Sequence, residues 1–263
     1  MNTKRSIRLF GSLLCLSLAA LACAGPESTP ELDGAPPTAA APETAAGALV
    51  ARSIAFHDPG GIWGTRPIEV DWAGTNGEGE ERVAVQFSLG ADQADFRLTG
   101  RYAGSTLEYE TSADTWSAVV DGETELSDET REEMRLHRED GFFWRGYYGF
   151  LAGLPMKILD PGARLDPEVT DTTFEDRPVR AARLTYDPSV GGDTWYFYFD
   201  PTTAQLVGAR FYHDETINDG EYLVFEGLAE DAGLRLVKHR EWYVNADDRF
   251  LGADEIQSIE VGS

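Results

Sequence analysis

The side chains of this sequence that could form a metal site fall into two small groups far apart along the chain. One is His57-Asp58 and the other is His213-Asp214-Glu215. Imidazole and carboxylate ligands together suit zinc or manganese, so the groups would bind metal if the fold joined them. The alternative is that each serves a turn or a strand end. Because nothing in the spacing fixes their approach, we expect no metal site and no cofactor.

Motifs of the common hydrolases and nucleotide-binding enzymes do not occur in the sequence. It contains no Gly-x-Ser-x-Gly elbow, no His-Glu-x-x-His helix and no phosphate-binding loop. We therefore expect a protein without catalytic residues, and a hydrolase or metal enzyme is the least favoured of the functions considered.

Two cations near the C-terminus could bind an anionic group. Lys238, Arg240 and Trp242 are two residues apart in an apolar stretch that also contains Leu234 and Leu236. At the period of a strand they share one face, and a cation in a dry pocket would bind a carboxylate or a headgroup. The alternative is cross-strand ion pairing with Glu221 or Asp214. The sequence leaves both interpretations open.

The element that must position these residues is the stretch 193–226, which begins with five consecutive aromatic residues, 195–199. Aromatic runs favour strands over helices. At a period of two, Trp195, Phe197 and Phe199 share one face and the two tyrosines share the other. Turn residues follow twice, so we expect an antiparallel meander with rings on both faces. Such a sheet is covered on both sides or curves around something apolar.

A second apolar element, residues 141–151, interrupts the strands and continues as far as Ile158. It is apolar on every side, which indicates burial, a position over a cavity, or a contact with a membrane or partner. We expect it to cover a pocket whose floor is one ring face of the meander; the alternative is that its rings are simply core. The predicted ligand-binding residues are Phe143, Trp144, Tyr147, Phe150, Leu151, Met156, Trp195, Phe197, Phe199, Lys238, Arg240 and Trp242.

The rest of residues 48–263 is typical of one mainly β (α+β) domain. Residues 46–56 predict a short helix, and Ser127 can cap another. Residues 160–162 and 165–167 are expected to be loops. The expected strands are residues 68–72, 83–89, 95–102, 105–111, 115–120, 169–174, 179–186, 234–244 and about 255–261, with the meander. We count about ten or eleven antiparallel strands.

The N-terminus has the pattern of an exported, lipid-anchored protein. Residues 1–22 combine a basic start with an apolar stretch too short to span a bilayer. Leu18-Ala19-Ala20-Leu21-Ala22-Cys23 resembles the lipobox of bacterial lipoproteins, which predicts acylation of Cys23; the alternative is ordinary signal-peptidase cleavage after residue 24. Residues 23–47 then form the anchor and a Pro/Ala-rich linker that cannot bury enough apolar surface to fold.

Charge and cysteine content exclude several functions. The net charge is −24, with 46 acidic against 22 basic residues, so the surface repels phosphate backbones and nucleic acid is not a partner. The only cysteines are Cys15 and Cys23, which excludes disulfides and thiol ligands from the folded domain. We expect a monomer that contacts the membrane through its N-terminal lipid only.

Two resemblances give these features a context. The aromatic strand, the Asp200-Pro201-Thr202-Thr203 turn and the stretch 233–238 resemble the lipoprotein-localisation carrier fold of bacteria, although Val237 stands where proline is usual. An uncharacterised family of bacterial lipoproteins is more similar over residues 50–254. The matching stretches are Gly153-Leu154-Pro155-Met156-Lys157, Asp160-Pro161-Gly162, 195–201, 211–215, 219–222 and 238–245.

The carrier resemblance implies an open antiparallel half-barrel with a helical lid inserted mid-chain over an apolar cavity. By that analogy the chain binds or transfers a hydrophobic ligand, a lipid or a lipoprotein acyl chain. It would face the periplasm from the outer membrane, which Ala24 after the Cys also fits. The alternative is a non-catalytic envelope scaffold that docks a protein partner through the aromatic segment. A fold alone is weak support for either function.

Overall fold

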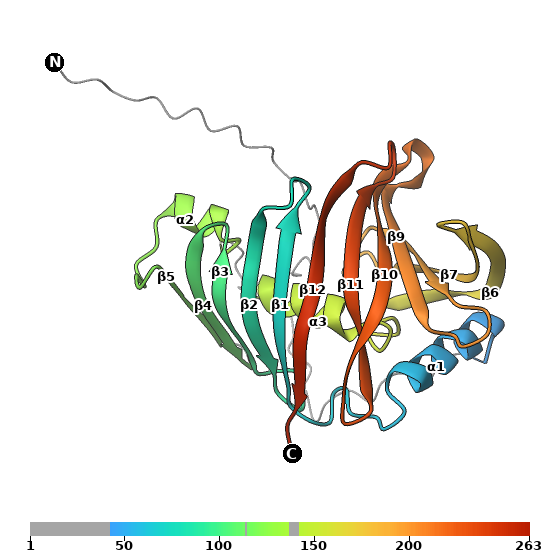
Figure 1. Ribbon diagram of the computed structural model, residues 1–263, viewed down its shortest axis with the longest axis horizontal. Helices are drawn as coiled ribbons and strands as arrows, with labels where there is room; N and C mark the ends of the chain where they lie inside the picture. Colours follow the sequence, from blue (N-terminus) through green and yellow to red (C-terminus); the bar gives the residue numbers. More distant parts are fainter. Residues whose placement is uncertain (1–42, 114, 137–141) are drawn as a thin grey trace.

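The computed structural model describes residues 43–113, 115–136 and 142–263. These residues form one antiparallel sheet of twelve strands with three α-helices (Figure 1). The strands are β1 (Ile68–Asn76), β2 (Glu81–Leu89), β3 (Phe96–Tyr102), β4 (Ser105–Ser112), β5 (Thr115–Val120), β6 (Ala163–Phe174), β7 (Arg177–Tyr186), β8 (Thr194–Phe199), β9 (Leu206–Asp214), β10 (Asp219–Asp231), β11 (Leu234–Val244) and β12 (Phe250–Val261). The helices are α1 (Ala45–His57), α2 (Asp128–Glu133) and α3 (Phe143–Gly153), and a 3₁₀ turn, η1 (Glu215–Ile217), lies between β9 and β10.

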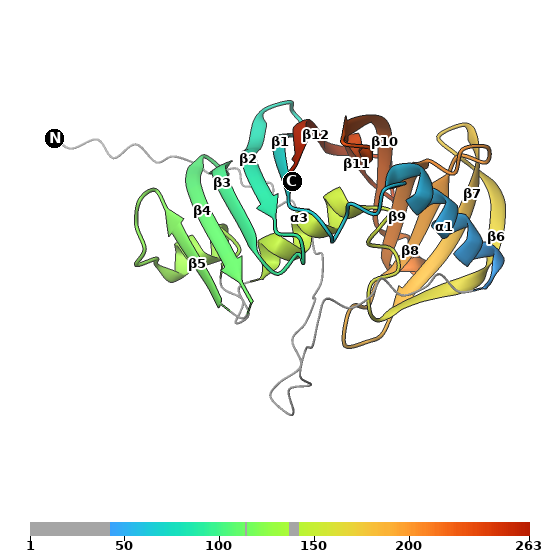
Figure 2. The ribbon, with the colours of Figure 1, turned by 90° about the horizontal axis from the view of Figure 1, so that it is seen from below.

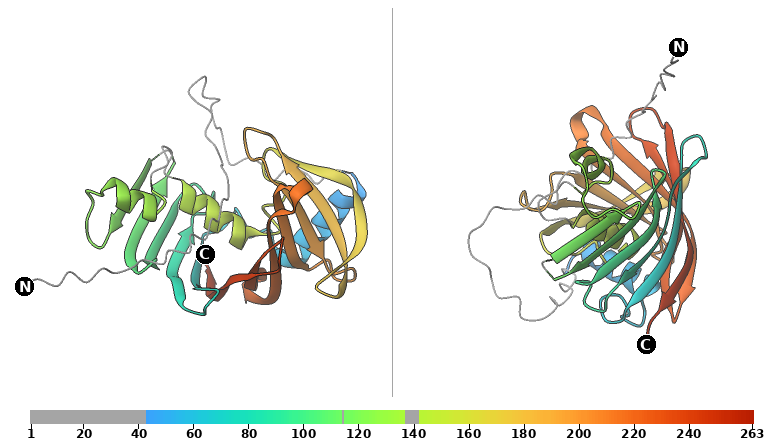
Figure 3. Two further views of the ribbon diagram at one scale, coloured as in Figure 1. Left: turned by 90° about the horizontal axis from the view of Figure 1, so that it is seen from above. Right: turned by 90° about the vertical axis from the view of Figure 1, so that its left-hand side faces the viewer.

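The strand order explains why a helix crosses the middle of the molecule. The order is β5-β4-β3-β2-β1-β12-β11-β10-β9-β8-β7-β6, so the first and last strands pair at the centre and the consecutive strands β5 and β6 form opposite edges. The chain must therefore pass from one edge to the other between β5 and β6. It does so across the concave face of the curved sheet, where α3 lies between the two halves (Figures 2 and 3).

Alternation along the strands separates an apolar concave face from a largely polar convex one. In β2, Val83, Val85, Phe87 and Leu89 are buried, and the residues between them are not. This is the pattern of a sheet with one covered face. The convex face carries its own small cluster of rings and aliphatic residues over β6–β10, made of Phe174, Val179, Ala181, Tyr198, Tyr222 and Val224. The prediction of rings on both faces of the meander is confirmed.

Helix α1 closes one end of the concave face. Its N-terminus is capped by the hydroxyl of Thr44, which accepts a hydrogen bond from the Gly47 amide at 3.1 Å. Ala46, Leu49 and Val50 are buried on its inner side, and the helix packs against β6, β7 and β11. The helix expected at residues 46–56 is thus confirmed within one residue at each end.

The observed architecture confirms an open antiparallel half-barrel, mainly β, with a helix over its concave face. Twelve strands are present rather than ten or eleven. The loop expected at residues 165–167 is wrong, because these residues lie in β6, where the register with β7 shifts between Leu165 and Val169. Residues 1–42, with the predicted leader, Cys23 and most of the predicted linker, are outside the described residues. No helix among those described is long and apolar enough to cross a membrane.

Candidate functional site

Helix α3 forms despite its aromatic sequence because tertiary packing compensates for low helix propensity. Trp144, Tyr147, Tyr148 and Leu151 are all less than 10% exposed. The indole of Trp144 donates a hydrogen bond to the carbonyl oxygen of Met134 at 3.1 Å, which satisfies its buried N–H. The helix is therefore an integral part of the core and not only a cover over it.

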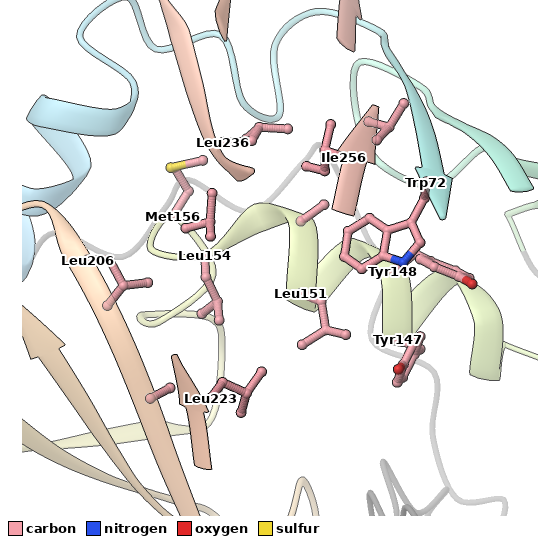
Figure 4. Packing of buried hydrophobic residues seen from close by; sticks show 14 of the residues in the cluster. Trp72, Tyr147, Tyr148, Leu151, Leu154, Met156, Leu206, Leu223, Leu236 and Ile256 are labelled. Atoms are coloured by element: carbon pink, nitrogen blue, oxygen red, sulfur yellow. The ribbon is translucent and has the colours of Figure 1, made fainter. Parts of the chain in front are cut away.

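The first half of α3 fills the concave face over β1–β3. The ring centroid of Tyr148 lies 5.4 Å from that of Trp72 and 4.9 Å from that of Phe87, distances at which aromatic pairs stabilise each other. The ring centroids of Trp144 and Tyr102 are 4.7 Å apart. Figure 4 shows Tyr148 beside Trp72. Over β1–β3, therefore, the rings of α3 are part of the hydrophobic core, as the alternative interpretation of the apolar segment predicts.

The second half of α3 meets a different surface. Phe150, which is only partly buried, lies edge-on to Trp195 at 5.3 Å. Trp195 in turn stacks on Phe197 at 5.7 Å and on Phe211 at 4.8 Å. We refer to Phe150, Trp195, Phe197 and Phe211 as the aromatic shelf. It is formed by α3, β8 and β9 on the concave face.

Arg240 holds the end of α3 against the sheet. Its side chain is fully buried and its Nη2 donates a hydrogen bond to the carbonyl oxygen of Leu151 at 3.0 Å. The guanidinium also lies over the ring of Trp72 at 4.6 Å, a cation–π contact. Burial lowers the pKa of Arg240 to about 10, opposed by Asp254, so the side chain is charged at neutral pH. Nε and Nη1 have no hydrogen-bond partner among the described residues.

The expected ion-pair partners of the two cations are wrong. Arg240 lies opposite Asp254 of β12 in the sheet register, not beside Glu221 or Asp214. The Asp254 carboxylate also accepts hydrogen bonds from Arg82 at 2.5 Å and from the Trp242 indole at 2.8 Å. A buried carboxylate needs such partners. The sequence patterns did not identify Asp254 as the acidic residue of this site.

Lys238 does not join the concave face as the strand period predicted. Its side chain is 46% exposed and pairs with Glu255 at 3.5 Å, whereas Leu236 and Arg240 on either side are buried. Its hydrocarbon stem lies close to Gly227, whose φ is +65°. The structure therefore places Lys238 at the surface, away from the aromatic shelf.

A polar corner borders the aromatic shelf, and the sequence did not predict it as a unit. Asp193, His213 and Glu221 lie at adjacent ends of β8, β9 and β10. Thr194 pairs with Tyr212 and Glu221 pairs with Phe211, which brings the three side chains together. His213 Nδ1 is 2.8 Å from Asp193 Oδ1, and the imidazole lies edge-on to Phe211 at 5.4 Å.

Burial controls the acidity of this corner. It raises the pKa of Glu221 to about 7, against the attraction of His213 and Arg249. It also raises the pKa of Asp193, and the hydrogen bond from His213 opposes that shift. Glu221 Oε2 is buried and has no hydrogen-bond partner among the described residues. Clusters with perturbed pKa values next to an apolar surface are candidate binding sites.

The first of the two candidate metal-ligand groups, His57-Asp58, is structural. His57 Nδ1 is 2.7 Å from the carbonyl oxygen of Arg235, and Nε2 accepts a hydrogen bond from the amide of Leu206 at 3.2 Å. Burial lowers the pKa of His57 to about 4, so the ring is neutral. Asp58 accepts hydrogen bonds from the next turn, as the alternative interpretation expected. Within residues 43–113, 115–136 and 142–263, no group of His, Cys, Asp and Glu could hold a metal ion.

The structure brings most of the predicted ligand-binding residues into one continuous core. Only Lys238 lies elsewhere. Phe143 and Phe150 are partly buried, and the others are buried in the same cluster: Trp144, Tyr147, Leu151, Met156, Trp195, Phe197, Phe199, Arg240 and Trp242. Their role in binding stays a prediction.

Comparison with protein families gives a match over residues 121–259 to a family of unknown function, DUF6503. The chain belongs to this family. The matched region runs from the turn after β5 to β12, so it contains α3, the aromatic shelf, Arg240 and the polar corner. No curated protein matches the sequence. The predicted membership of an uncharacterised family is confirmed, and it brings no activity with it.

Solved structures share the fold at very low sequence identity. A LolA superfamily protein from Nitrosomonas europaea is 8% identical, with a TM-score of 0.50 over 83% of this chain and 94% of that one. A putative outer membrane lipoprotein-sorting protein domain from Vibrio parahaemolyticus is 10% identical, with a TM-score of 0.47 over 81% and 89%. A DUF1329 family protein from Desulfovibrio piger is 10% identical, with a TM-score of 0.47 over 81% and 92%. The likeness to the first confirms a LolA-like fold for this member of DUF6503.

Proposed function

We propose that this DUF6503 protein binds a hydrophobic chain, a lipid or a lipoprotein acyl chain, on the concave face of its half-barrel. The observation that carries the proposal is the aromatic shelf, where Phe150 of α3 meets Trp195 and is only partly buried. The first half of α3 fills its side of the sheet with Trp144 and Tyr148, so the ligand is assigned to the second half. Apolar, concave surfaces beside a few polar groups are typical of ligand sites.

Access to the shelf depends on α3. The helix is attached to the sheet near its C-terminus by the hydrogen bond from Arg240 to Leu151, beside the residues that a ligand would contact. A chain that enters between Phe150 and Trp195 therefore displaces or shifts this end of the helix. The buried orientation of Trp144, Tyr147 and Leu151 also leaves little of the aromatic segment for a docked protein, which disfavours the scaffold alternative.

We place the domain in the bacterial envelope as a lipoprotein anchored through Cys23. The support is the leader-like pattern of residues 1–22 and the LolA-like fold, a fold shared with a LolA superfamily protein. Outer-membrane attachment on the periplasmic face is part of the same proposal. Intact-mass spectrometry tests the anchor: the expected mass is that of a chain beginning at Cys23 with added acyl groups, and a non-acylated mature chain contradicts it.

Titration with a long-chain fatty acid tests the site. Trp195 lies on the shelf, so its fluorescence should change on addition of the ligand. Phe150→Ala should weaken binding about tenfold, since burying a phenylalanine side chain contributes roughly 1.5–3 kcal/mol. Phe250→Ala is the matched control, because Phe250 is among the most exposed large apolar residues described. Absence of binding to fatty acid, amine and alcohol amphiphiles alike would overturn the proposal.

A further inference from the structure

The polar corner beside the aromatic shelf has an unusual imbalance of acceptors over donors. Glu221 is 9% exposed and Asn245 is 7% exposed. Glu221 Oε2 and Asn245 Oδ1 are both buried, and neither has a hydrogen-bond partner among the described residues. Buried polar atoms are rarely left unpaired, and each unpaired atom raises the free energy of the fold.

The two unpaired oxygens lie on either side of one strand end. Glu221 is the register partner of Phe211 in β9. The Asn245 amide donates from Nδ2 to the carbonyl oxygen of Phe211 at 2.9 Å, and its main-chain N–H donates to the carbonyl oxygen of Gly220. This fixed amide leaves Oδ1 as its free acceptor. A ligand with N–H donors that reached Glu221 Oε2 would satisfy an acceptor that the described residues leave unpaired.

Acidic groups also outnumber basic groups around Glu221. His213 acts on it from β9, and Asp219 and Arg249 act on it from the start of β10 and the turn before β12. Asp193, just before β8, is hydrogen-bonded to that His213. Three carboxylates therefore oppose one arginine and one histidine. The His213 ring is already 2.8 Å from Asp193, and Arg249 has its own partner in Asp247. The corner is thus acidic and short of donors.

We propose that the polar corner binds the ammonium head of an amphiphile whose alkyl chain lies on the aromatic shelf. This inference rests on the proposed function, because the shelf must first accept a chain. The head of such a ligand is positively charged, whereas that of a fatty acid is negatively charged. Arg240 is not available to attract an anionic head instead, since its guanidinium is buried, donates to Leu151 and lies over the ring of Trp72.

The geometry divides the two parts of the ligand between neighbouring surfaces. Phe211 stacks on Trp195 on one side and contacts His213 on the other. A chain on the shelf therefore ends within reach of Glu221. A primary ammonium has three N–H donors, which suit the carboxylates of Glu221 and Asp193. Charge-assisted hydrogen bonds of this type are the stronger class.

Calorimetric titration of the purified domain with three C12 amphiphiles tests the inference. The probes are dodecylammonium, dodecyltrimethylammonium, which has the charge without N–H donors, and dodecanoate. At pH 8 we expect dodecylammonium to bind about tenfold more tightly than either of the others. Equal affinity for the three, or tighter binding of dodecanoate, would overturn this inference and leave chain binding intact. Binding of none of them would overturn the proposed function itself.

Two variants test whether Glu221 causes the preference for dodecylammonium over dodecanoate. Glu221→Gln should bring the affinity ratio of dodecylammonium to dodecanoate close to one, and Glu226→Gln, on the same strand but exposed and paired with Arg177, should leave the ratio unchanged. The ratio is measured within each variant, so a change in stability does not alter it. A Glu221→Gln protein that keeps the wild-type ratio would contradict the assignment to Glu221. Lysophosphatidylethanolamine binding as tightly as dodecylammonium would identify a phospholipid as the source of the ammonium, and weak binding would identify a simple amine.

Discussion

Arg240 of β11 donates a hydrogen bond from its guanidinium to the main-chain oxygen of Leu151, in the last turn of α3, at 3.0 Å. A cation at this end of a helix interacts favourably with the carbonyl groups that have no partner within the helix. The contact links the central strands to the one helix that crosses the concave face. Arg240 is thus a structural anchor of α3, and the proposed headgroup lies at the other end of the shelf.

Arg240→Ala should lower the free energy of unfolding by about 3 kcal/mol or more, because it opens a cavity and leaves Asp254 with fewer cations. Arg240→Met should cost about 1 kcal/mol, since it keeps most of the volume and removes two unpaired donors. Urea unfolding measures both. Lys238→Met is the control on the same strand, with an expected change within about 0.5 kcal/mol. An Arg240→Ala variant as stable as wild type would show that the anchor is unimportant.

Two glycines of α3 predict opposite effects of the same substitution. A Cβ added at Gly149 would meet nothing within 4 Å, whereas one at Gly153 would overlap with the indole of Trp63. Gly149→Ala should therefore stabilise the protein by roughly 0.5–1 kcal/mol through helix propensity. Gly153→Ala should destabilise it by about 1–3 kcal/mol through overpacking. Thermal unfolding of the two variants tests whether α3 packs as described; equal shifts of the same sign would contradict it.

Much of the fold could be predicted because it depends on local patterns. Alternation in β2 and the aromatic run of β8 specify strands by themselves, and the bounds of β11 match the expected residues 234–244. The bulge in β6 could not be found this way. Asp166 and Pro167 have the residue types of a loop and have no register partner in β7, but the strand pairs with β7 on either side of them, at Leu165 and at Val169.

The candidate site was less predictable because it depends on register between strands. The sequence groups His213 with its neighbours Asp214 and Glu215, yet its partner is Asp193, which is 20 residues away. That contact follows from the pairing of β8 with β9. Lys238 lies beside Gly227 of the neighbouring strand, a contact that the period-two pattern does not contain. Arg240 and Asp254 meet only because β12 returns to the centre of the sheet.

His57 should make the protein less stable in mild acid. Burial lowers its pKa from 6.5 to about 4, so the unfolded chain binds the proton first as the pH falls. The contribution of neutral His57 is fully present above pH 6.5 and is lost as the pH falls towards 4, by roughly 3 kcal/mol in all. Denaturant unfolding at several pH values should show this loss in wild type and a flatter profile in His57→Gln.

A matched variant separates His57 from other groups that titrate in the same window. His239 has a partly exposed side chain, 32% accessible, so His239→Gln is the control for replacing a histidine away from the contacts with Arg235 and Leu206. If His57→Gln and wild type lost stability in parallel between pH 6.5 and 4, the ring would not be held neutral by its contacts with Arg235 and Leu206.

Glu221 should produce a dependence on pH with the opposite sign. Burial raises its pKa from 4.5 to about 7, so the folded protein keeps the proton over a range in which the unfolded chain has lost it. The stability contributed by the protonated carboxyl is fully present below pH 4.5 and is lost as the pH rises through 7, by roughly 3 kcal/mol. Glu221→Gln removes this loss, and it should be more stable than wild type at pH 8 and similar to it at pH 4.5.

The difference between wild type and variant isolates Glu221, because His57 acts on both proteins equally and in the opposite direction. Glu226→Gln provides the control at an exposed position of β10, where no such difference between pH 4.5 and 8 is expected. Bound ammonium amphiphile would stabilise the ionised carboxylate, so saturating dodecylammonium should reduce the advantage of Glu221→Gln at pH 8. If Glu221→Gln were less stable than wild type at pH 8 without ligand, the carboxylate would have a partner in the folded protein, and the polar corner would not be short of donors.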